Sequence, residues 1–302
     1  MLAPNVPAAR SVLDAVNLTR LMERTVGRAE VVVGLIDGSV AAGHVDLATE
    51  NIRFLSASSG GAPTHVSGTA LTHGTFVAGI LAARRGTAAP AICPGCTLAV
   101  RPIFLHPGIA SADTPSARSH DLADAIMDCV EAGARILNLS LSLAMPSPNR
   151  EPKLEQALDH AAARGTLVVA AAGNQGTVGS SAITRHPWVV PVVACDLVGR
   201  PLALTNLSNS IARRGLMAPG DAVTSLGTQG RTFTSGGTSA ATPFVTGALA
   251  LLLSVFPEVN GAQARSIVTR ADVRRAAIVP PMLDAWSAYQ AMLKGRGRSS
   301  RA

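Results

Sequence analysis

The stretch Gly236-Gly237-Thr238-Ser239-Ala240-Ala241-Thr242-Pro243 precedes an apolar run, residues 244–255, that is long enough for a buried helix. Two glycines permit a tight turn or a close backbone approach. A serine in the first turn of such a helix lies near unpaired N–H groups and the positive end of the helix dipole. We expect Pro243 to be tolerated because it falls in the helix's first turn. Ser239 is therefore either a helix cap or a nucleophile, and the rest of the chain has to decide.

Apolar runs typical of buried strands alternate along the chain with helical patterns of ten or more residues. Strands are expected at 31–36, 97–103, 135–141, 166–172, 189–194 and within 215–226; helices are expected at 11–26, 76–85, 121–132, 151–164, 239–256, 261–271 and 284–293. This alternation predicts an α/β fold of three layers, with a mainly parallel sheet and helices on both faces. No composition shift marks a boundary, so we expect a single domain over residues 1–294 and a basic, disordered tail over 295–302.

Composition and charge exclude several classes of function. Of the 302 residues 47% are apolar, which allows a sizeable core, but only 3% are aromatic, and the arginines behind the net charge of +7 are scattered. We therefore expect no nucleic-acid partner. The N-terminus lacks a signal-peptide pattern and the apolar runs are too short to cross a bilayer, so a cytoplasmic protein without membrane contact is expected.

The four cysteines leave the redox compartment open. Cys93-Pro94-Gly95-Cys96 has the spacing of a zinc knuckle, but no second Cys or His pair follows at a fitting distance, so no metal site is expected. A disulfide and plain buried thiols both remain open for Cys93, Cys96, Cys129 and Cys195.

Four polar residues fall at the ends of buried elements: Asp37, His73, Asn174 and Ser239. A serine needs a base to take its proton, and histidine has a suitable pKa. The histidine in turn needs a carboxylate to fix its tautomer, and the tetrahedral intermediate needs donors for its oxyanion. The order Asp, His, Ser along the chain is the order found in subtilisin.

The segments around these residues resemble those of the subtilisin-like serine protease family, over about residues 28–270. They read Asp37-Gly38, His73-Gly74-Thr75-Phe76-Val77-Ala78-Gly79, Ala171-Ala172-Gly173-Asn174 and Gly237-Thr238-Ser239-Ala240-Ala241-Thr242-Pro243. The resemblance implies a serine endopeptidase with Asp37, His73 and Ser239 as its triad, Asn174 as oxyanion donor, and no cofactor. It also implies that a peptide substrate binds as an added strand between Ser140, Leu141 and Ser142 on one side and Ala171, Ala172 and Gly173 on the other.

Within the family the chain looks most like the protease domains of cyanobactin maturation enzymes. The likeness lies in Leu35-Ile36-Asp37-Gly38, in the run from Pro94 to Phe104, and in residues 130–136. It implies processing of a ribosomal peptide precursor; the alternatives are a general degradative subtilase and a catalytically silent binding protein of the same fold. The preferred residue before the scissile bond and the oligomeric state are left open.

Two departures from the family pattern carry expectations of their own. Only 36 residues precede Asp37, and a start at Met1 favours the absence of the family's inhibitory pro-domain. Residues 84–94 contain no Asp, Asn or Glu, so the calcium site that many family members have there is not expected.

Overall fold

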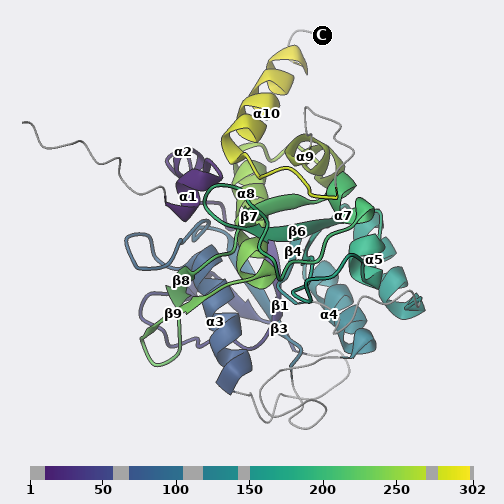
Figure 1. Ribbon diagram of the computed structural model, residues 1–302. Helices are drawn as coiled ribbons and strands as arrows, with labels where there is room; N and C mark the ends of the chain where they lie inside the picture. The colour runs from purple at the N-terminus through teal and green to yellow at the C-terminus, as the bar shows by residue number, and fades with distance from the viewer. Residues whose placement is uncertain (1–10, 57–67, 105–117, 142–149, 270–277, 300–302) are drawn as a thin grey trace, which may run out of the picture.

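The computed structural model describes residues 11–56, 68–104, 118–141, 150–269 and 278–299. Its main sheet has seven strands in the order β2-β3-β1-β4-β5-β6-β7, and every neighbouring pair is parallel (Figure 1). The strands are β1 (Val32–Asp37), β2 (Ile52–Phe54), β3 (Thr97–Pro102), β4 (Ile136–Leu139), β5 (Leu167–Ala171), β6 (Val189–Cys195) and β7 (Leu216–Pro219). An antiparallel hairpin, β8 (Val223–Leu226) and β9 (Thr232–Ser235), lies apart from this sheet.

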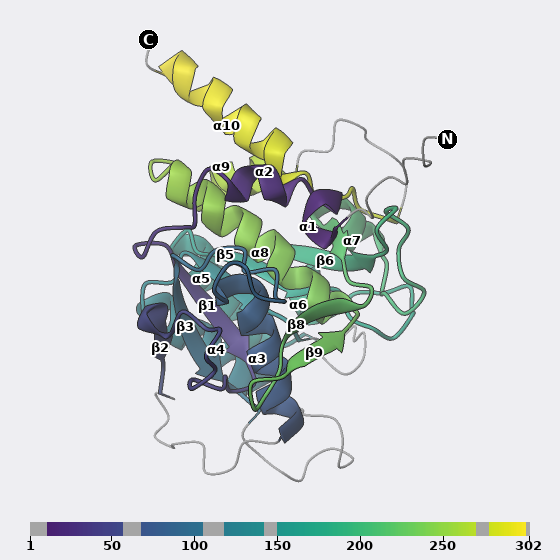
Figure 2. The same ribbon diagram turned by 90° about the vertical axis from the view of Figure 1, so that its left-hand side faces the viewer.

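Helices cover both faces of the sheet, which confirms the predicted three-layer α/β fold (Figure 2). On one face α3 (Gly68–Ala82) and α8 (Thr238–Val255) pack with Leu35 of β1; on the other α4 (Ser119–Glu131) and α5 (Pro152–Ala163) pack with Ile36. Neighbouring residues of β1 thus face opposite layers, as in any strand buried on both sides. The other helices are α1 (Val12–Ala15), α2 (Leu18–Met22), α6 (Ala182–Arg185), α7 (Asn209–Arg214), α9 (Gly261–Val268), α10 (Ala285–Ser299) and the 3₁₀ turn Thr49–Asn51.

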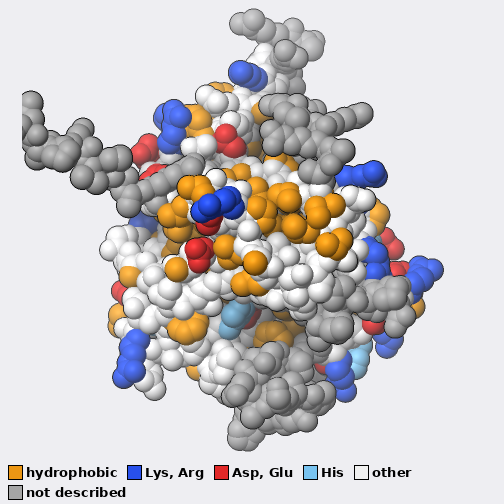
Figure 3. All heavy atoms as spheres, in the orientation of Figure 1, with side chains coloured by type: hydrophobic (Ala, Val, Ile, Leu, Met, Phe, Trp, Pro, Cys, Tyr) orange, Lys and Arg blue, Asp and Glu red, His pale blue; other side chains and the backbone are white. Residues whose placement is uncertain are grey.

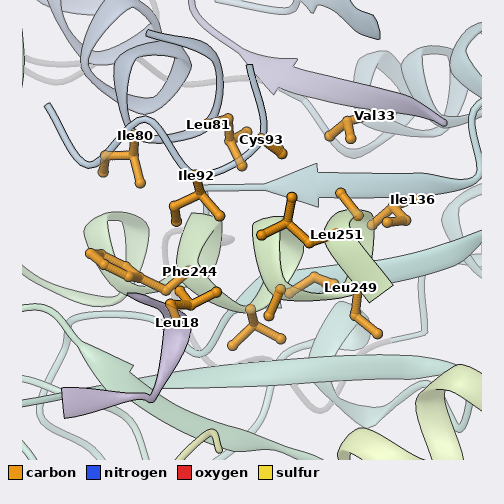
Figure 4. Close-up of a cluster of buried hydrophobic side chains, with 14 of the residues drawn as sticks. Leu18, Val33, Ile80, Leu81, Ile92, Cys93, Ile136, Phe244, Leu249 and Leu251 are labelled. Carbon is orange, nitrogen blue, oxygen red and sulfur yellow. The ribbon is translucent and has the colours of Figure 1, made fainter. Parts of the chain in front are cut away.

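Helix α8 runs through the centre of the larger core cluster. Figure 4 shows Phe244, Leu249 and Leu251 of α8 among side chains of α2, α3, β1 and β4. Over the described part of the chain, α8 is the one helix with the length and apolarity to cross a bilayer, and 89% of it is buried inside the protein. That burial is what a core helix of a globular domain shows.

The structure differs from the sequence expectations at both ends of the described chain. The expected helix over 11–26 is broken at Asn17, which has a left-handed φ of 54°, so two short helices form. At the other end, α10 continues through Ser299, into the stretch expected to be a disordered tail; Arg296 pairs there with Glu258 at 3.3 Å. Residues 300–302 lie outside the described residues, and the single domain over 1–294 stays a prediction.

All four cysteines are free and buried. Burial raises the pKa of the Cys129 and Cys195 thiols to about 12. Cys93 and Cys96 lie at the two ends of a turn closed by the bond from the Cys96 N–H to the Cys93 carbonyl, 3.0 Å. Cys96 Sγ also lies 3.7 Å from Ser254 Oγ.

The loop after α3 is tied to the N-terminal helices by an arginine. The Arg85 guanidinium donates to the carbonyl oxygens of Met22 (2.6 Å), Thr25 (2.8 Å) and Ile92 (3.1 Å). Over the described residues, no cluster of three or more His, Cys, Asp or Glu side chains could hold a metal ion.

We therefore predict that calcium contributes little to stability. A chelator should shift the melting temperature by less than about 2 °C, because residues 84–94 offer no acidic ligand whose binding of calcium would add free energy to the folded state. Arg85→Ala should lower the melting temperature equally with and without chelator. Thermal unfolding in EDTA and in added calcium checks this; a large drop in EDTA would reveal a calcium site and contradict the prediction.

Candidate active site

The carboxyl end of β1 lies where the strand order of the sheet reverses, because β3 and β4 flank β1 on opposite sides. Sheets of this kind bind their ligands in the crevice beyond such an end. Asp37 is the last residue of β1 and is fully buried. Its Oδ1 accepts hydrogen bonds from the Gly38 N–H at 2.6 Å and from His73 Nδ1 at 2.7 Å.

Two glycines allow this contact between β1 and α3. A Cβ on Gly38 would overlap the Ala70 carbonyl oxygen, and one on Gly74 would overlap the Ser39 carbonyl oxygen. Any side chain at either position would push α3 away from the end of β1. Close backbone approach therefore sets the short distance between His73 and Asp37.

His73 lies inside α3 rather than at its start. The sequence predicted a helix from Phe76, but α3 begins at Gly68, so His73 is its sixth residue. The side chain is 27% exposed, and its Nδ1 contacts Asp37. Burial lowers the His73 pKa, but the charge and hydrogen bond of Asp37 raise it by more, so the pKa lies above its ordinary value of 6.5.

Ser239 lies in the first turn of α8, as predicted, and α8 packs against α3. Gly237, with a φ of 95°, turns the chain into the helix. Over the described residues the Ser239 N–H has no backbone acceptor, as expected for an amide at a helix start. The expectation for Pro243 was wrong, since α8 begins at Thr238 and Pro243 therefore lies inside the helix, beyond the first turn.

Asn174, in the loop after β5, is held with its amide nitrogen free to donate. Thr238 gives two hydrogen bonds to Asn174 Oδ1, from its backbone N–H at 2.9 Å and from its hydroxyl at 3.0 Å. The Thr238 hydroxyl accepts in turn from the Gly173 N–H, 3.2 Å. Because both neighbours of Oδ1 are donors, the orientation of the amide is fixed chemically, and Nδ2 lies against Gly237 near the start of α8.

The residues that hold the Asn174 loop in place were not predicted from the sequence. Thr238 was quoted only as part of a motif. Asn206, which is 4% exposed, accepts hydrogen bonds at Oδ1 from the N–H groups of Gln175 and Thr177, and its own N–H donates to the Gly173 carbonyl. A buried asparagine between short elements has no periodicity that would reveal it. The one general rule that points to such a residue is that the side-chain amide of a buried asparagine must be hydrogen-bonded.

The predicted substrate-binding residues lie at the carboxyl ends of β4 and β5. Pairing of β4 with both neighbours ends at Leu139, so Ser140 and Leu141 leave the sheet at the same edge as Asp37. Ala171 ends β5, and Ala172 and Gly173 follow toward Asn174. Ser142 lies outside the described residues. The described members of both predicted walls therefore share one edge of the sheet.

The face of the molecule in Figure 3 has a hollow with a histidine side chain in it. A pocket of about 300 Å³ lies elsewhere, at the amino ends of β4 and β5, lined by Val130, Gly133, Ala134, Arg135, Arg164, Gly165, Thr166, Asn260 and Gly261. It is at the opposite edge of the sheet from Asp37 and shares none of the candidate residues.

The chain is similar to known proteins in sequence and in fold. Residues 28–285 match the model of the Subtilase family, Peptidase S8. The chain is 35% identical to subtilisin DY of Bacillus licheniformis over 79% of its own length and 82% of that protein. It spans 59% of the length of several other subtilisins that it matches, among them subtilisin E of Bacillus subtilis.

Two solved structures share most of the fold. The prenylagaramide maturation protease PagA has a TM-score of 0.78 at 25% identity, with 90% of this chain and 98% of that chain covered. The self-cleaved protease domain of PatA has a TM-score of 0.75 at 30% identity, with 89% of this chain and 98% of that chain covered.

Proposed function

The chain belongs to the subtilase family of serine endopeptidases, and on this premise we propose that Asp37, His73 and Ser239 are its catalytic triad, that Asn174 helps to bind the oxyanion, and that the substrate is a ribosomal peptide precursor. The observation that carries the proposal is the 2.7 Å bond between the fully buried Asp37 carboxylate and His73, which lies on a helix that packs against α8, whose first turn holds Ser239.

The proposed residues would act in a fixed order during peptide hydrolysis. Ser239 Oγ attacks the scissile carbonyl carbon while His73 Nε2 takes its proton, and Asp37 stabilises the resulting imidazolium through Nδ1–H. Asn174 Nδ2–H and the Ser239 N–H donate to the oxyanion. His73 then protonates the leaving amine, and water, deprotonated by the same ring, hydrolyses the acyl-enzyme.

Asn174→Ala is expected to lower kcat by about 10²–10³-fold with little change in KM, the loss known for the oxyanion asparagine of subtilisin. The amide donates to an atom that is charged only in the transition state, so substrate binding should not depend on it. Asn209→Ala, at an exposed asparagine that begins α7, is the control and should keep kcat within about twofold. A loss expressed only in KM would contradict the role of Asn174.

The rate should rise with pH as His73 loses its proton. The general base must be neutral, and Asp37 holds the His73 pKa above 6.5 in the free enzyme, so kcat/KM should increase through a pH above 6.5. In Asp37→Asn the negative charge that raises the His73 pKa is gone, while burial still lowers this pKa. The midpoint of the kcat/KM profile should therefore move to lower pH. Profiles of kcat/KM from pH 5 to 9 check this; an unmoved midpoint would assign the titration to another group.

Precursor processing is supported by the likeness to two proteins described as maturation proteases, PagA and PatA. The test is a panel of ribosomal precursor peptides, each with its leader and core, set against casein and against the same peptides with scrambled leaders. Cleavage at one junction, with kcat/KM at least about 100-fold above that for casein, supports the proposal. Equal digestion of casein and scrambled peptides would show a general degradative peptidase, and Ser239→Ala controls for contaminating activity.

A further inference from the structure

The backbone carbonyl of Ser239 lacks the donor that a regular helix would give it. In an α-helix the carbonyl of residue i accepts from the N–H of residue i+4, which for Ser239 is Pro243. Proline has no N–H, and its ring pushes against the carbonyl four residues earlier. The regular α-helical partner is therefore missing, and a donor from outside α8 can take its place.

The partner is the side chain of Ser140, at the carboxyl end of β4. Its hydroxyl donates to the Ser239 carbonyl oxygen at 2.9 Å. Behind it Asn138 Nδ2 donates to Ser140 Oγ at 2.8 Å, and Thr246 Oγ1 donates to Asn138 Oδ1 at 2.8 Å. The three side chains are at most 2% exposed.

The direction of this chain of bonds is determined by its chemistry. An amide nitrogen can only donate, so the Ser140 hydroxyl accepts from Asn138 and has its own hydrogen left for the Ser239 carbonyl. The chain starts on α8 at Thr246, passes through β4 and returns to α8 at Ser239. Because every member is buried, breaking one bond leaves another group unsatisfied.

We propose that Ser140 is a positioning residue for the nucleophile: its side-chain hydroxyl fixes the peptide unit of Ser239, and through it the direction of Ser239 Oγ. This rests on the proposed role of Ser239, and it adds to Ser140 a function of the hydroxyl that is separate from any backbone contact with substrate. A small error in the position of an attacking atom lowers the rate of the chemical step without weakening substrate binding.

The first test compares steady-state kinetics of Ser140→Ala with those of Ser254→Ala. Ser254 is the matched control: it is 4% exposed and its hydroxyl donates to the Ala250 carbonyl near the far end of the same helix. Ser140→Ala should lower kcat about tenfold, roughly what one buried hydrogen bond is worth, and leave KM within about twofold. Ser254→Ala should lower the melting temperature to a similar extent but leave kcat unchanged.

A second test uses the proline that creates the need for Ser140. Pro243→Ala restores an N–H that can donate to the Ser239 carbonyl, so adding Ser140→Ala to it should cost much less than the tenfold seen in the wild-type background. Such coupling between two positions is what a double-mutant cycle measures. If Ser140→Ala does not fold, Thr246→Val tests the same series of hydrogen bonds without changing Ser140. It should lower kcat by a smaller factor than the tenfold expected for Ser140→Ala.

The outcomes separate the alternatives. An unchanged kcat in folded Ser140→Ala, an effect on KM alone, an equal loss in Ser254→Ala, or full additivity with Pro243→Ala would each overturn the positioning role. If the wild-type protein hydrolyses no peptide and Ser239 takes up no fluorophosphonate, the proposed function itself fails. If the wild type turns over normally and only the Ser140 comparison fails, the proposed function stands without this inference.

Discussion

Replacing Ser239 with alanine is expected to lower kcat for peptide hydrolysis by about 10⁶-fold, the loss seen for the corresponding serine of the related subtilisin. The expectation follows from the proposed site: the neighbouring Thr238 hydroxyl is bonded to Asn174 Oδ1, so the Ser239 hydroxyl is the group proposed to form the acyl intermediate. The proposed roles of His73 and Asp37 depend on it. The positioning and oxyanion donors that stay in place should sustain only a small residual rate over water. Steady-state kinetics on a cleavable peptide measure this.

The Ser239→Ala protein must be shown to remain folded. Ser239 is partly buried in the first turn of a core helix, and loss of its hydroxyl removes no hydrogen bond that the helix needs, so circular dichroism and the melting temperature should stay close to those of the wild type. A folded Ser239→Ala protein with a rate within tenfold of wild type would remove Ser239 from the role of nucleophile.

Asp37→Asn is expected to lower kcat by about 10⁴-fold, the size of loss seen when a triad aspartate is replaced by its amide. The Gly38 N–H and His73 Nδ1 both lie on Oδ1 of a fully buried carboxylate. An amide there cannot stabilise the imidazolium, and it can turn its NH₂ toward the ring and select the wrong tautomer. The matched control is Asp159→Asn, at an exposed aspartate that pairs with His186 at 3.1 Å on the surface; it should keep kcat within about twofold.

A modest loss in Asp37→Asn would contradict this account. If kcat fell less than about tenfold while the pH profile stayed in place, His73 would have to be oriented by some other group, and the buried carboxylate would be structural. Kinetics and the pH profile of the same preparation give both measurements.

The sequence predicted the elements that local pattern controls. Residues 31–36, 97–103 and 166–172 read as buried strands because continuous apolar runs are what a strand covered on both faces requires, and β1, β3 and β5 lie there. Carboxyl ends of parallel strands share one edge of the sheet, which is why the sequence alone could place Asp37 where such sheets bind their ligands.

The features that were not predicted from the sequence depend mostly on contacts between segments far apart along the chain. The start of α3 at Gly68 was not expected, since Gly68 and Thr69 are poor helix formers; packing of Ala70 against Gly38 lies beyond any local pattern. The hairpin strand β9 was not predicted either, because its residues are largely exposed and show no apolar run. From the sequence, Ser140 was predicted only to contact the substrate. Its proposed positioning role rests on the missing N–H of Pro243 and on the bond from the Ser140 hydroxyl to the Ser239 carbonyl oxygen.

The most direct measurement of the central claim is the site of covalent labelling by a fluorophosphonate. This reagent phosphonylates a serine hydroxyl only where a base activates it and donors stabilise the developing negative charge. Peptide mapping by mass spectrometry should find one adduct, on Ser239, which forms more slowly in Asn174→Ala and not at all in Ser239→Ala. A folded wild-type protein that takes up no label, or takes it up on another serine, would contradict the assignment of Asp37, His73 and Ser239 as the catalytic triad.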